Sequence, residues 1–229
     1  MATISTNLQA VLARIESAAR VCGRIPETVS LLAVSKTWPA SFVREAAAAG
    51  QRAFGENYVQ EGVDKIREVA RPDLAWHFIG PLQSNKTRPV AETFDWVHSV
   101  DRFRIAERLS QQRPEALPPL QVCLQVNISG EDSKSGVAPR DAPALARRIA
   151  LLPRITLRGL MAIPAPAADR AAQREPFRRL RLLLEQMVRE GLALDTLSMG
   201  MSNDIEAAIA EGATLVRVGT AIFGERTGS

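Results

Sequence analysis

Residues 30–57 of this 229-residue chain read SLLAVSKTWPASFVREAAAAGQRAFGEN. An apolar run predicts a β-strand at Ser30–Ser35, helical spacing follows over Ser41–Ala49, and a strand pattern returns at Arg52–Gly55. A strand, a helix and a second strand in close succession are typical of a parallel sheet, because the helix carries the chain back to the edge where the first strand began. This stretch therefore indicates an α/β fold.

The same alternation continues through the rest of the chain. Further strands are predicted at Ala75–Ile79, Trp96–Val100, Leu120–Asn127, Leu157–Ile163, Thr196–Met199 and Leu215–Gly219. Helical patterns lie between the strands at Tyr58–Val69, Arg102–Gln111, Ala142–Leu151, Phe177–Arg189 and Ile205–Ala210. The segment Gly80–Phe94 has the least regular helical pattern, because Pro81 and Pro89 bracket it. Ahead of the first strand, an additional amphipathic helix is marked by Leu8, Leu12, Ile15 and Ala19.

Eight strands separated by helices predict a single (β/α)8 barrel, the TIM barrel, with an extra N-terminal helix. No change in composition marks an internal boundary, so we expect one domain over residues 1–229. The extra helix is expected in residues 1–25 and the barrel in residues 30–224. An open, doubly wound sheet shares the alternation, but no glycine fingerprint for a dinucleotide follows the first strand.

The composition argues against a membrane protein and against a nucleic-acid-binding protein. Hydrophobic residues make up 46% of the chain, and no stretch approaches the roughly 18 apolar residues that span a bilayer. Met1–Ala10 shows no secretory signal, and Cys22 and Cys123 lie far apart in sequence, so a reduced, cytoplasmic setting is expected. The net charge of +4 is compatible with nucleic acid, but the arginines are spread over helices and aromatic residues make up only 5%. We expect neither a membrane nor a nucleic-acid partner.

Polar side chains gather at the ends of the predicted strands, where barrel enzymes keep their chemistry, and Lys36 is the most informative of them. Alternation along the first strand puts Leu32, Val34 and Lys36 on one face. At the mouth of the barrel this lysine would have a lowered pKa, and its neutral amine could add to a carbonyl to form a Schiff base. The alternative is a strand that ends earlier and leaves Lys36 as a solvated loop lysine. The strand pattern alone does not separate the two.

The ends of the last two strands have the features of a phosphate site. Ser198 and Gly200 end the seventh strand, and Gly219 and Thr220 repeat the arrangement after the eighth. Backbone N–H groups at a helix start favour anions, and barrels often bind phosphate in these two loops. The alternative is a plain capping box within Asn203–Glu206, which explains the helix start without a ligand.

Arg217 lies in the eighth strand, which neighbours the first strand once a barrel closes, so it can share a site with Lys36. An arginine inside the barrel needs an acceptor, and a pyridine nitrogen would serve as one. The alternative places the arginine on the outer face, paired with an acid of a helix.

Other chemistries have less support. The two histidines, His77 and His98, do not form a metal-spaced cluster, and no serine elbow is present. His77 is expected to be a core residue bonded to the backbone. Glu56 and Asp204 are candidate acids or bases, although helix-start electrostatics explains them equally well.

The longest ordered motif is WHFIGPLQSNK at residues 76–86. Further motifs are AVSK (33–36), FGENYVQE (54–61), VNI (126–128), SKSG (133–136), LSMGMS (197–202) and VRVGTAIFG (216–224). In these segments, which are spread over nearly the whole chain, the sequence resembles the pyridoxal phosphate homeostasis protein family. The fold of that family is similar to the barrel domain of alanine racemase, fold type III of pyridoxal phosphate proteins.

The resemblance implies that pyridoxal 5'-phosphate is held as a Schiff base on Lys36. It implies a phosphate site at Ser198, Gly200, Gly219 and Thr220, with Arg217 facing the pyridine nitrogen and Asn57 and Met161 near the ring. It assigns no chemical role to Gln83, Ser84, Asn85, Lys86 and Lys134.

The implied function is homeostasis of the cofactor, by storage, buffering or delivery, without efficient turnover. Arg217 keeps its proton and does not protonate the ring nitrogen, which makes the ring a weaker electron sink. A minimal amino-acid racemase or decarboxylase using the same cofactor is the alternative, and a Schiff-base aldolase acting on a sugar phosphate is a third hypothesis. We expect a monomer without a metal, whose partners are the cofactor and the apo-enzymes that accept it.

Overall fold

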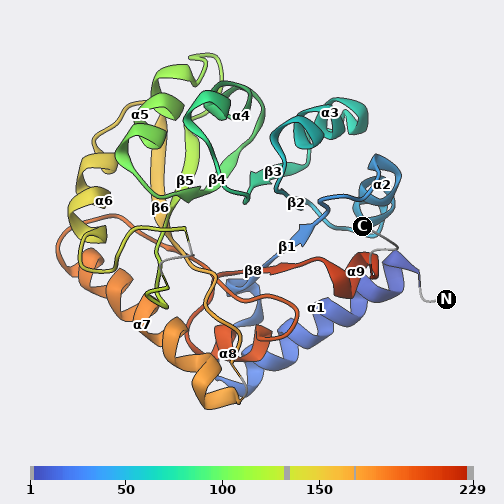
Figure 1. Ribbon diagram of the computed structural model, residues 1–229. Helices are drawn as coiled ribbons and strands as arrows, with labels where there is room; N and C mark the ends of the chain where they lie inside the picture. Colours follow the sequence, from blue (N-terminus) through green and yellow to red (C-terminus); the bar gives the residue numbers. More distant parts are fainter. Residues whose placement is uncertain (1–2, 132–134, 168, 226–229) are drawn as a thin grey trace.

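Eight parallel strands close into a barrel in this computed structural model, which describes residues 3–131, 135–167 and 169–225. Each strand pairs with its neighbours in chain order, and the last strand pairs with the first (Figure 1). The strands are β1 (Ser30–Val34), β2 (Ala53–Glu56), β3 (Ala75–Phe78), β4 (Trp96–Val100), β5 (Leu120–Gln125), β6 (Ile155–Met161), β7 (Thr196–Ser198) and β8 (Leu215–Val218). The predicted (β/α)8 barrel is confirmed, and the alternative of an open sheet is wrong.

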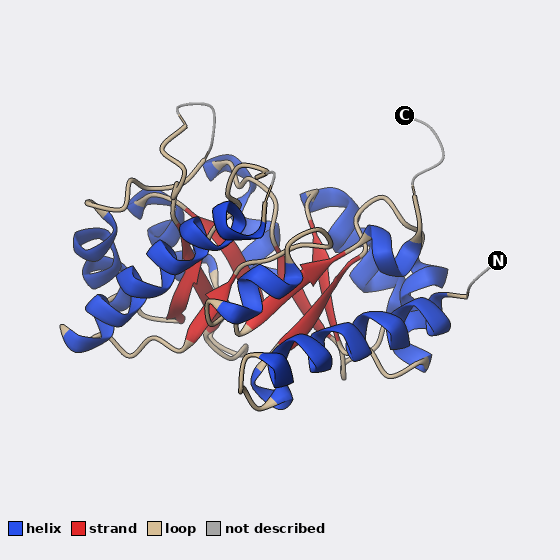
Figure 2. Cartoon of the chain, turned by 90° about the horizontal axis from the view of Figure 1, so that it is seen from below, coloured by secondary structure: helices blue, strands red, loops and turns tan. Residues whose placement is uncertain are grey.

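Helices cover the outside of the strand ring (Figure 2). They are α1 (Ile4–Val21), α2 (Ala40–Ala48), α3 (Val59–Val69), α4 (Thr87–Thr93), α5 (Phe103–Gln112), α6 (Ala142–Ala150), α7 (Arg170–Arg189), α8 (Ile205–Ala210) and α9 (Thr220–Phe223), with short 3-10 turns η1 (Pro26–Thr28) and η2 (Ser84–Lys86). The predicted extra helix is α1, which packs against α8 and α9 at the other end of the sequence. Among the described residues, no helix has the length and apolar character needed to cross a bilayer.

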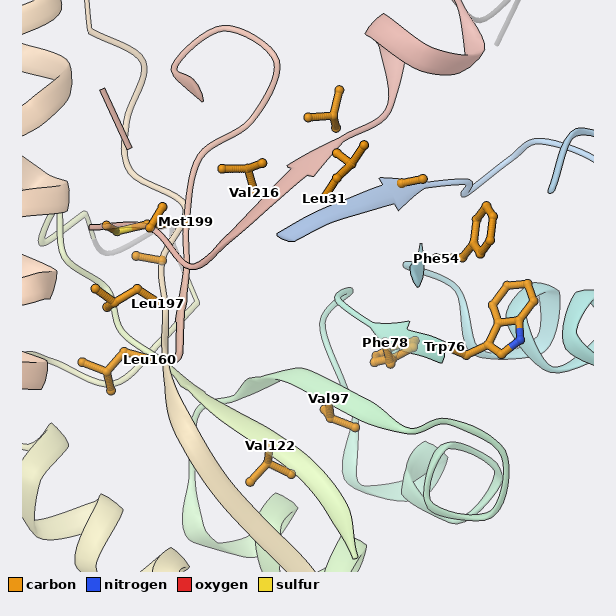
Figure 3. Packing of buried hydrophobic residues seen from close by; sticks show 14 of the residues in the cluster. Leu31, Phe54, Trp76, Phe78, Val97, Val122, Leu160, Leu197, Met199 and Val216 are labelled. Atoms are coloured by element: carbon orange, nitrogen blue, oxygen red, sulfur yellow. The ribbon is translucent and has the colours of Figure 1, made fainter. Parts of the chain in front are cut away.

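Alternation along the strands separates two buried regions. Side chains that face outward form the main core beneath the helices, and Figure 3 shows Leu31, Phe54, Phe78, Val97 and Val216 among them. The residues between these outward-facing positions turn toward the inside of the ring and include Leu32, His77, His98, Cys123, Met161, Ser198 and Arg217. Branched apolar side chains usually fill the inside of such a barrel. Here histidine, serine and arginine side chains share that space.

The structure settles the bounds of two helices that contain a proline. α7 begins at Arg170 rather than at Phe177, because the Asp169 carboxylate caps it by accepting a hydrogen bond from Ala172 N at 2.8 Å. Proline disfavours a helix interior, yet Pro176 lies inside this long helix. α4 is short, and Pro89 lies in its first turn, where a backbone N–H has no helical partner to lose.

Candidate functional site

One cavity of about 460 Å³ opens where the strands end at the C-terminal rim of the barrel. This volume lies within the range of about 300–1,000 Å³ that is typical of small-molecule and cofactor sites. Its walls come from the segments that follow β1, β2, β3, β6, β7 and β8, so almost the whole rim takes part. The polar side chains around it are Lys36, Asn57, Gln173, Ser202, Asn203, Asp204, Arg217 and Thr220.

The structure brings the eight predicted cofactor residues to this end of the barrel in two layers. Five of them line the cavity, namely Lys36, Asn57, Arg217, Gly219 and Thr220. The other three, Met161, Ser198 and Gly200, are buried and do not line it. Met161 and Ser198 are register partners on β6 and β7, facing the inside of the barrel. The sequence therefore predicted residues that lie together at this end of the barrel, but it did not separate those that line the cavity from those buried beneath it.

The segment that carries Lys36 is held in an unusual backbone conformation. β1 ends at Val34, one residue earlier than predicted, so Lys36 lies in the turn after the strand, as in the alternative interpretation; it is nevertheless half-buried and lines the cavity. Thr37 has a φ of 68°, in the left-handed region that a β-branched residue rarely occupies. Its backbone N–H donates to Glu61 Oε1 at 2.5 Å, which fixes the loop immediately after the lysine.

A buried charged cluster, made of Lys65, Glu56, Glu61 and Ser35, supports the same segment from below. The Lys65 ammonium donates to Ser35 O at 2.8 Å, to Glu56 Oε1 at 2.7 Å and to Glu61 Oε1 at 2.8 Å, which uses all three of its hydrogens. The Ser35 hydroxyl also donates to Glu56 Oε1, at 2.6 Å. Burial raises the pKa of the Glu56 carboxyl, and the nearby Lys65 charge works in the opposite direction. Both residues flanking Lys36 are thus tied to this cluster.

Sequence reasoning missed Lys65. The only signal was its spacing of four residues from Glu61 on one helix, a pattern that usually marks a solvated surface pair. Glu56 was proposed as an acid or base or as a helix-start charge, but it has no exposed surface and bonds Lys65 and Ser35 instead.

Arg217 lies inside the barrel, so the alternative of an outward arginine paired with a helix acid is wrong. Only 4% of its surface is exposed, and it lines the cavity. One guanidinium nitrogen, Nη1, donates to Ser198 Oγ at 2.7 Å, and Nη2 donates to Ala162 O at 2.9 Å. Burial lowers the pKa of Arg217 to about 10, which still leaves it protonated near neutral pH.

The two histidines continue this set of bonds across the barrel. Ser198 Oγ lies 2.8 Å from His98 Nδ1, and His98 Nε2 lies 2.9 Å from His77 Nδ1. His77 stacks on Trp96 with the ring centroids 5.3 Å apart. His77 was expected to bond to the backbone; its contact with His98 corrects that prediction, which needed the register between β3 and β4 to be known. Among the described residues, no group of three or more metal-binding side chains is found.

Lowering the pH is expected to destabilise the fold through these histidines. Burial lowers the pKa of His77 from 6.5 to about 3, and burial also lowers the pKa of His98, with His77 and Arg217 adding to the effect. The unfolded chain therefore binds protons first, and stability present above pH 6.5 is lost as the pH falls toward the folded pKa, by about 1.4 kcal/mol per pH unit for each histidine.

Urea unfolding of the wild type and of His77→Gln between about pH 6 and pH 4.5 checks this expectation. The variant should lose stability less steeply than the wild type as the pH falls. Equal slopes for the two proteins would mean that His77 takes up its proton equally in both states. The raised pKa of Glu56 makes the folded protein more stable as the pH falls, which opposes the effect of the histidines. The difference in slope between the two proteins therefore reports on His77, because both contain Glu56.

Asn57 carries an unpartnered acceptor beside the cavity. Its Oδ1 is buried and has no hydrogen-bond partner among the described residues. Its backbone is fixed by Gly80, because a Cβ at position 80 would lie 2.0 Å from Asn57 O. The glycine of the WHFIGPLQSNK motif therefore places Asn57. Gln83, Ser84, Asn85 and Lys86 of the same motif form the turn η2 and its entry and do not line the cavity, and Lys134 lies outside the described residues.

The loop between β7 and α8 differs from the predicted capping box. Asp204 precedes α8, its side chain caps no helical N–H, and its Oδ1 instead accepts from Met201 N at 2.5 Å. Glu206 pairs with Arg14 of α1, whose Nε lies 2.6 Å from Glu206 Oε1, while Arg14 Nη1 donates to Ser202 O at 2.7 Å. The N-terminal helix thus anchors a wall of the cavity. α8 and α9 have only six and four residues, so loop groups rather than a long helix dipole face the cavity here.

Sequence reasoning also missed the loop that follows β6. Residues 163–167 line the cavity together with Gln173 of α7, and Ala165 N donates to Ser129 Oγ at 3.0 Å. These five residues are isoleucine, alanine and proline, so none of them has a polar side chain that would indicate a site in the sequence. Trp38, stacked on Phe42 with centroids 5.0 Å apart, completes the wall near Lys36.

Comparison with known proteins points to one family and one fold. Residues 6–227 match the family described as alanine racemase, N-terminal domain. The chain is 65% identical to the pyridoxal phosphate homeostasis protein of Pseudomonas aeruginosa, covering 99% of this chain and 97% of that one. The structure of PipY from Synechococcus elongatus with PLP bound is 42% identical, with a TM-score of 0.80 over 92% of this chain and 100% of PipY. Alanine racemase from Corynebacterium glutamicum, 18% identical, shares the fold with a TM-score of 0.70 over 96% of this chain and 62% of the enzyme.

Proposed function

Because this chain belongs to the pyridoxal phosphate homeostasis proteins, a family built on the alanine racemase N-terminal domain, we propose that it binds pyridoxal 5'-phosphate in the cavity at the rim of the barrel. The PLP-bound structure of PipY supports the choice of ligand. The proposed function is homeostasis of this cofactor, by storage, buffering or delivery to apo-enzymes, with the cofactor held as a Schiff base on Lys36.

The residues around the cavity fit this ligand, and one observation carries the assignment: a lysine, a buried arginine and an asparagine all line the same cavity. The Lys36 amine would bond the aldehyde carbon, and Arg217 would donate to the pyridine nitrogen. Asn57 would lie near the ring of the ligand. Gly219, Thr220 and Ser202 line the cavity where loop groups can hold the phosphate.

When bound, the cofactor supplies an electrophilic aldehyde carbon and a conjugated ring. Lys36 would hold the cofactor covalently and reversibly through its side-chain nitrogen, with loss of one water molecule. Arg217 stays protonated near neutral pH, so it would donate a hydrogen bond to the ring nitrogen without turning that nitrogen into a cation. A ring without that charge withdraws electrons weakly, which favours holding the cofactor over turning over an amino acid.

Absorbance and borohydride trapping test the proposal. Protein mixed with saturating pyridoxal 5'-phosphate should turn yellow, and borohydride should fix the mass of the reduced cofactor on the peptide that contains Lys36. A colourless protein with no trapped mass would rule out the proposed function and leave a Schiff-base aldolase acting on a sugar phosphate as the hypothesis to pursue. Loss of α-proton stereochemistry from an added amino acid would instead favour a racemase.

Replacing Arg217 with methionine should weaken cofactor binding while leaving trapping at Lys36 possible. The loss of a charged hydrogen bond, worth about 1.5–3 kcal/mol, predicts an increase in Kd of about tenfold to a hundredfold and a shifted absorption band. Arg113→Met is the matched control, because Arg113 is also buried, with 3% of its surface exposed, and bonds only backbone oxygens away from the cavity. Equal effects of the two variants on Kd would place Arg217 outside the binding contacts.

A further inference from the structure

A continuous line of polar side chains crosses the inside of the barrel from β8 to β3. It runs from Arg217 to Ser198, from Ser198 to His98 and from His98 to His77, with donor–acceptor distances of 2.7, 2.8 and 2.9 Å. Each of the four side chains is at least 96% buried, since none has more than 4% of its surface exposed. Burying a polar group costs free energy unless it is hydrogen-bonded, and apolar side chains would fill the same space without that cost. A role beyond packing is therefore expected for these four side chains.

The guanidinium at one end sets the direction of every bond in this line. Arginine only donates, so Ser198 Oγ must accept the bond from Arg217 Nη1. The serine hydroxyl has one hydrogen, and among the described residues its other bonded neighbour is His98 Nδ1. If His98 Nδ1 carried a hydrogen instead, the Ser198 hydrogen would be buried without an acceptor, which is unfavourable. Ser198 therefore donates to His98 Nδ1.

The same reasoning determines which ring nitrogen of each histidine carries the hydrogen. Both are buried and neutral, so each carries one hydrogen. Because His98 Nδ1 accepts, its hydrogen lies on Nε2, and His98 donates to His77 Nδ1. His77 then carries its own hydrogen on Nε2, and its ring stacks on Trp96. The result is a chain of hydrogen bonds that all point away from the cavity.

We propose that Ser198, His98 and His77 are positioning residues that act through Arg217, and that Ser198 is not a phosphate ligand. A phosphate oxygen would need the hydrogen of the Ser198 hydroxyl, and that hydrogen is committed to His98. The serine instead fixes Nη1 and, together with Ala162 O on Nη2, locks the plane of the guanidinium at the cavity floor. The part that concerns the cofactor rests on the proposed function, whereas the direction of the hydrogen bonds does not.

The direction is tested on the ligand-free protein by ¹⁵N NMR of the imidazole rings. Both histidines should be neutral near pH 7, with hydrogen on Nε2 and an accepting Nδ1. A hydrogen on Nδ1 of either ring, or a positively charged ring, would overturn the proposal. This measurement needs neither a variant nor the cofactor, so it remains decisive even if the protein binds no pyridoxal phosphate.

The role of Ser198 is tested by comparing two ligands, pyridoxal 5'-phosphate and pyridoxal, which lacks the phosphate. If Ser198 acts through Arg217, Ser198→Ala should weaken the binding of both ligands by the same factor, of about tenfold. Thr220→Val, at a residue proposed to face the phosphate, should weaken the phosphorylated ligand alone. Selective loss of the phosphorylated ligand in Ser198→Ala, or no loss of either, would overturn the proposal. If the wild type bound neither ligand, the proposed function would fail and the NMR result would still stand.

Discussion

Lys36→Ala should abolish both the yellow colour with pyridoxal 5'-phosphate and the mass trapped by borohydride. The colour requires a bond between an amine and the aldehyde carbon, and Lys36 is the lysine that lines the cavity among the described residues. The other lysine near this segment, Lys65, does not substitute, because all three of its hydrogens are bonded and only 5% of it is exposed. The loss should therefore be complete rather than partial.

Two controls separate loss of the amine from loss of the fold. Lys36 is half-buried and lies after β1, so the variant should unfold at nearly the same urea concentration as the wild type. Lys86→Ala, in the turn η2 and away from the cavity lining, should keep the full absorbance. A trapped mass on another peptide of the Lys36 variant would move the covalent site elsewhere, and Lys86 would then be the first position to examine.

Lys65→Met should destabilise the fold by about 3–5 kcal/mol, because it leaves buried carboxylates without their cation. Glu56 has no exposed surface, and its second oxygen, Oε2, already lacks a partner among the described residues. Removing the ammonium also frees Ser35 O and Glu61, so the segment around Lys36 loses its support. Cofactor binding should weaken along with stability. Urea unfolding measures the first effect and titration with pyridoxal 5'-phosphate the second.

Arg88→Met provides the matched control for this prediction. Arg88 and Glu92 share the spacing of four residues that Glu61 and Lys65 have, but their side chains are 65% and 44% exposed. Such a surface pair adds little to stability, so the midpoint of unfolding should hardly move. The double variant Lys65→Met with Glu56→Gln should recover part of the loss, because the buried negative charge is removed. If Lys65→Met lost no stability, the prediction would be wrong, and water would have to reach the carboxylates of the cluster.

The barrel could be predicted from the sequence because each predicted strand is a short apolar run and most predicted helices have apolar residues at helical spacing. Alternation along β1 put Lys36 on the same face as Val34, and both residues line the cavity, although the strand pattern alone did not separate this placement from a solvated loop lysine. Contacts between strands were out of reach, because the pairing of His77 with His98 depends on register and barrel closure. The burial of Lys65 was hidden for a related reason: its spacing fits a surface helix, and only the neighbouring β1 and β2 segments cover it.

The cavity draws on opposite ends of the sequence, because Lys36 follows the first strand and Arg217 belongs to the last. During translation β1 is made before the other seven strands, and β8 is the last of the eight to be made. Until then β1 lacks the neighbour that closes the ring on that side, and this long-range pairing is the slow kind to form. A nascent chain in which β8 has not yet paired with β1 has neither Arg217 in place nor a closed ring, so the proposed binding site is complete only once the last strand has joined the first.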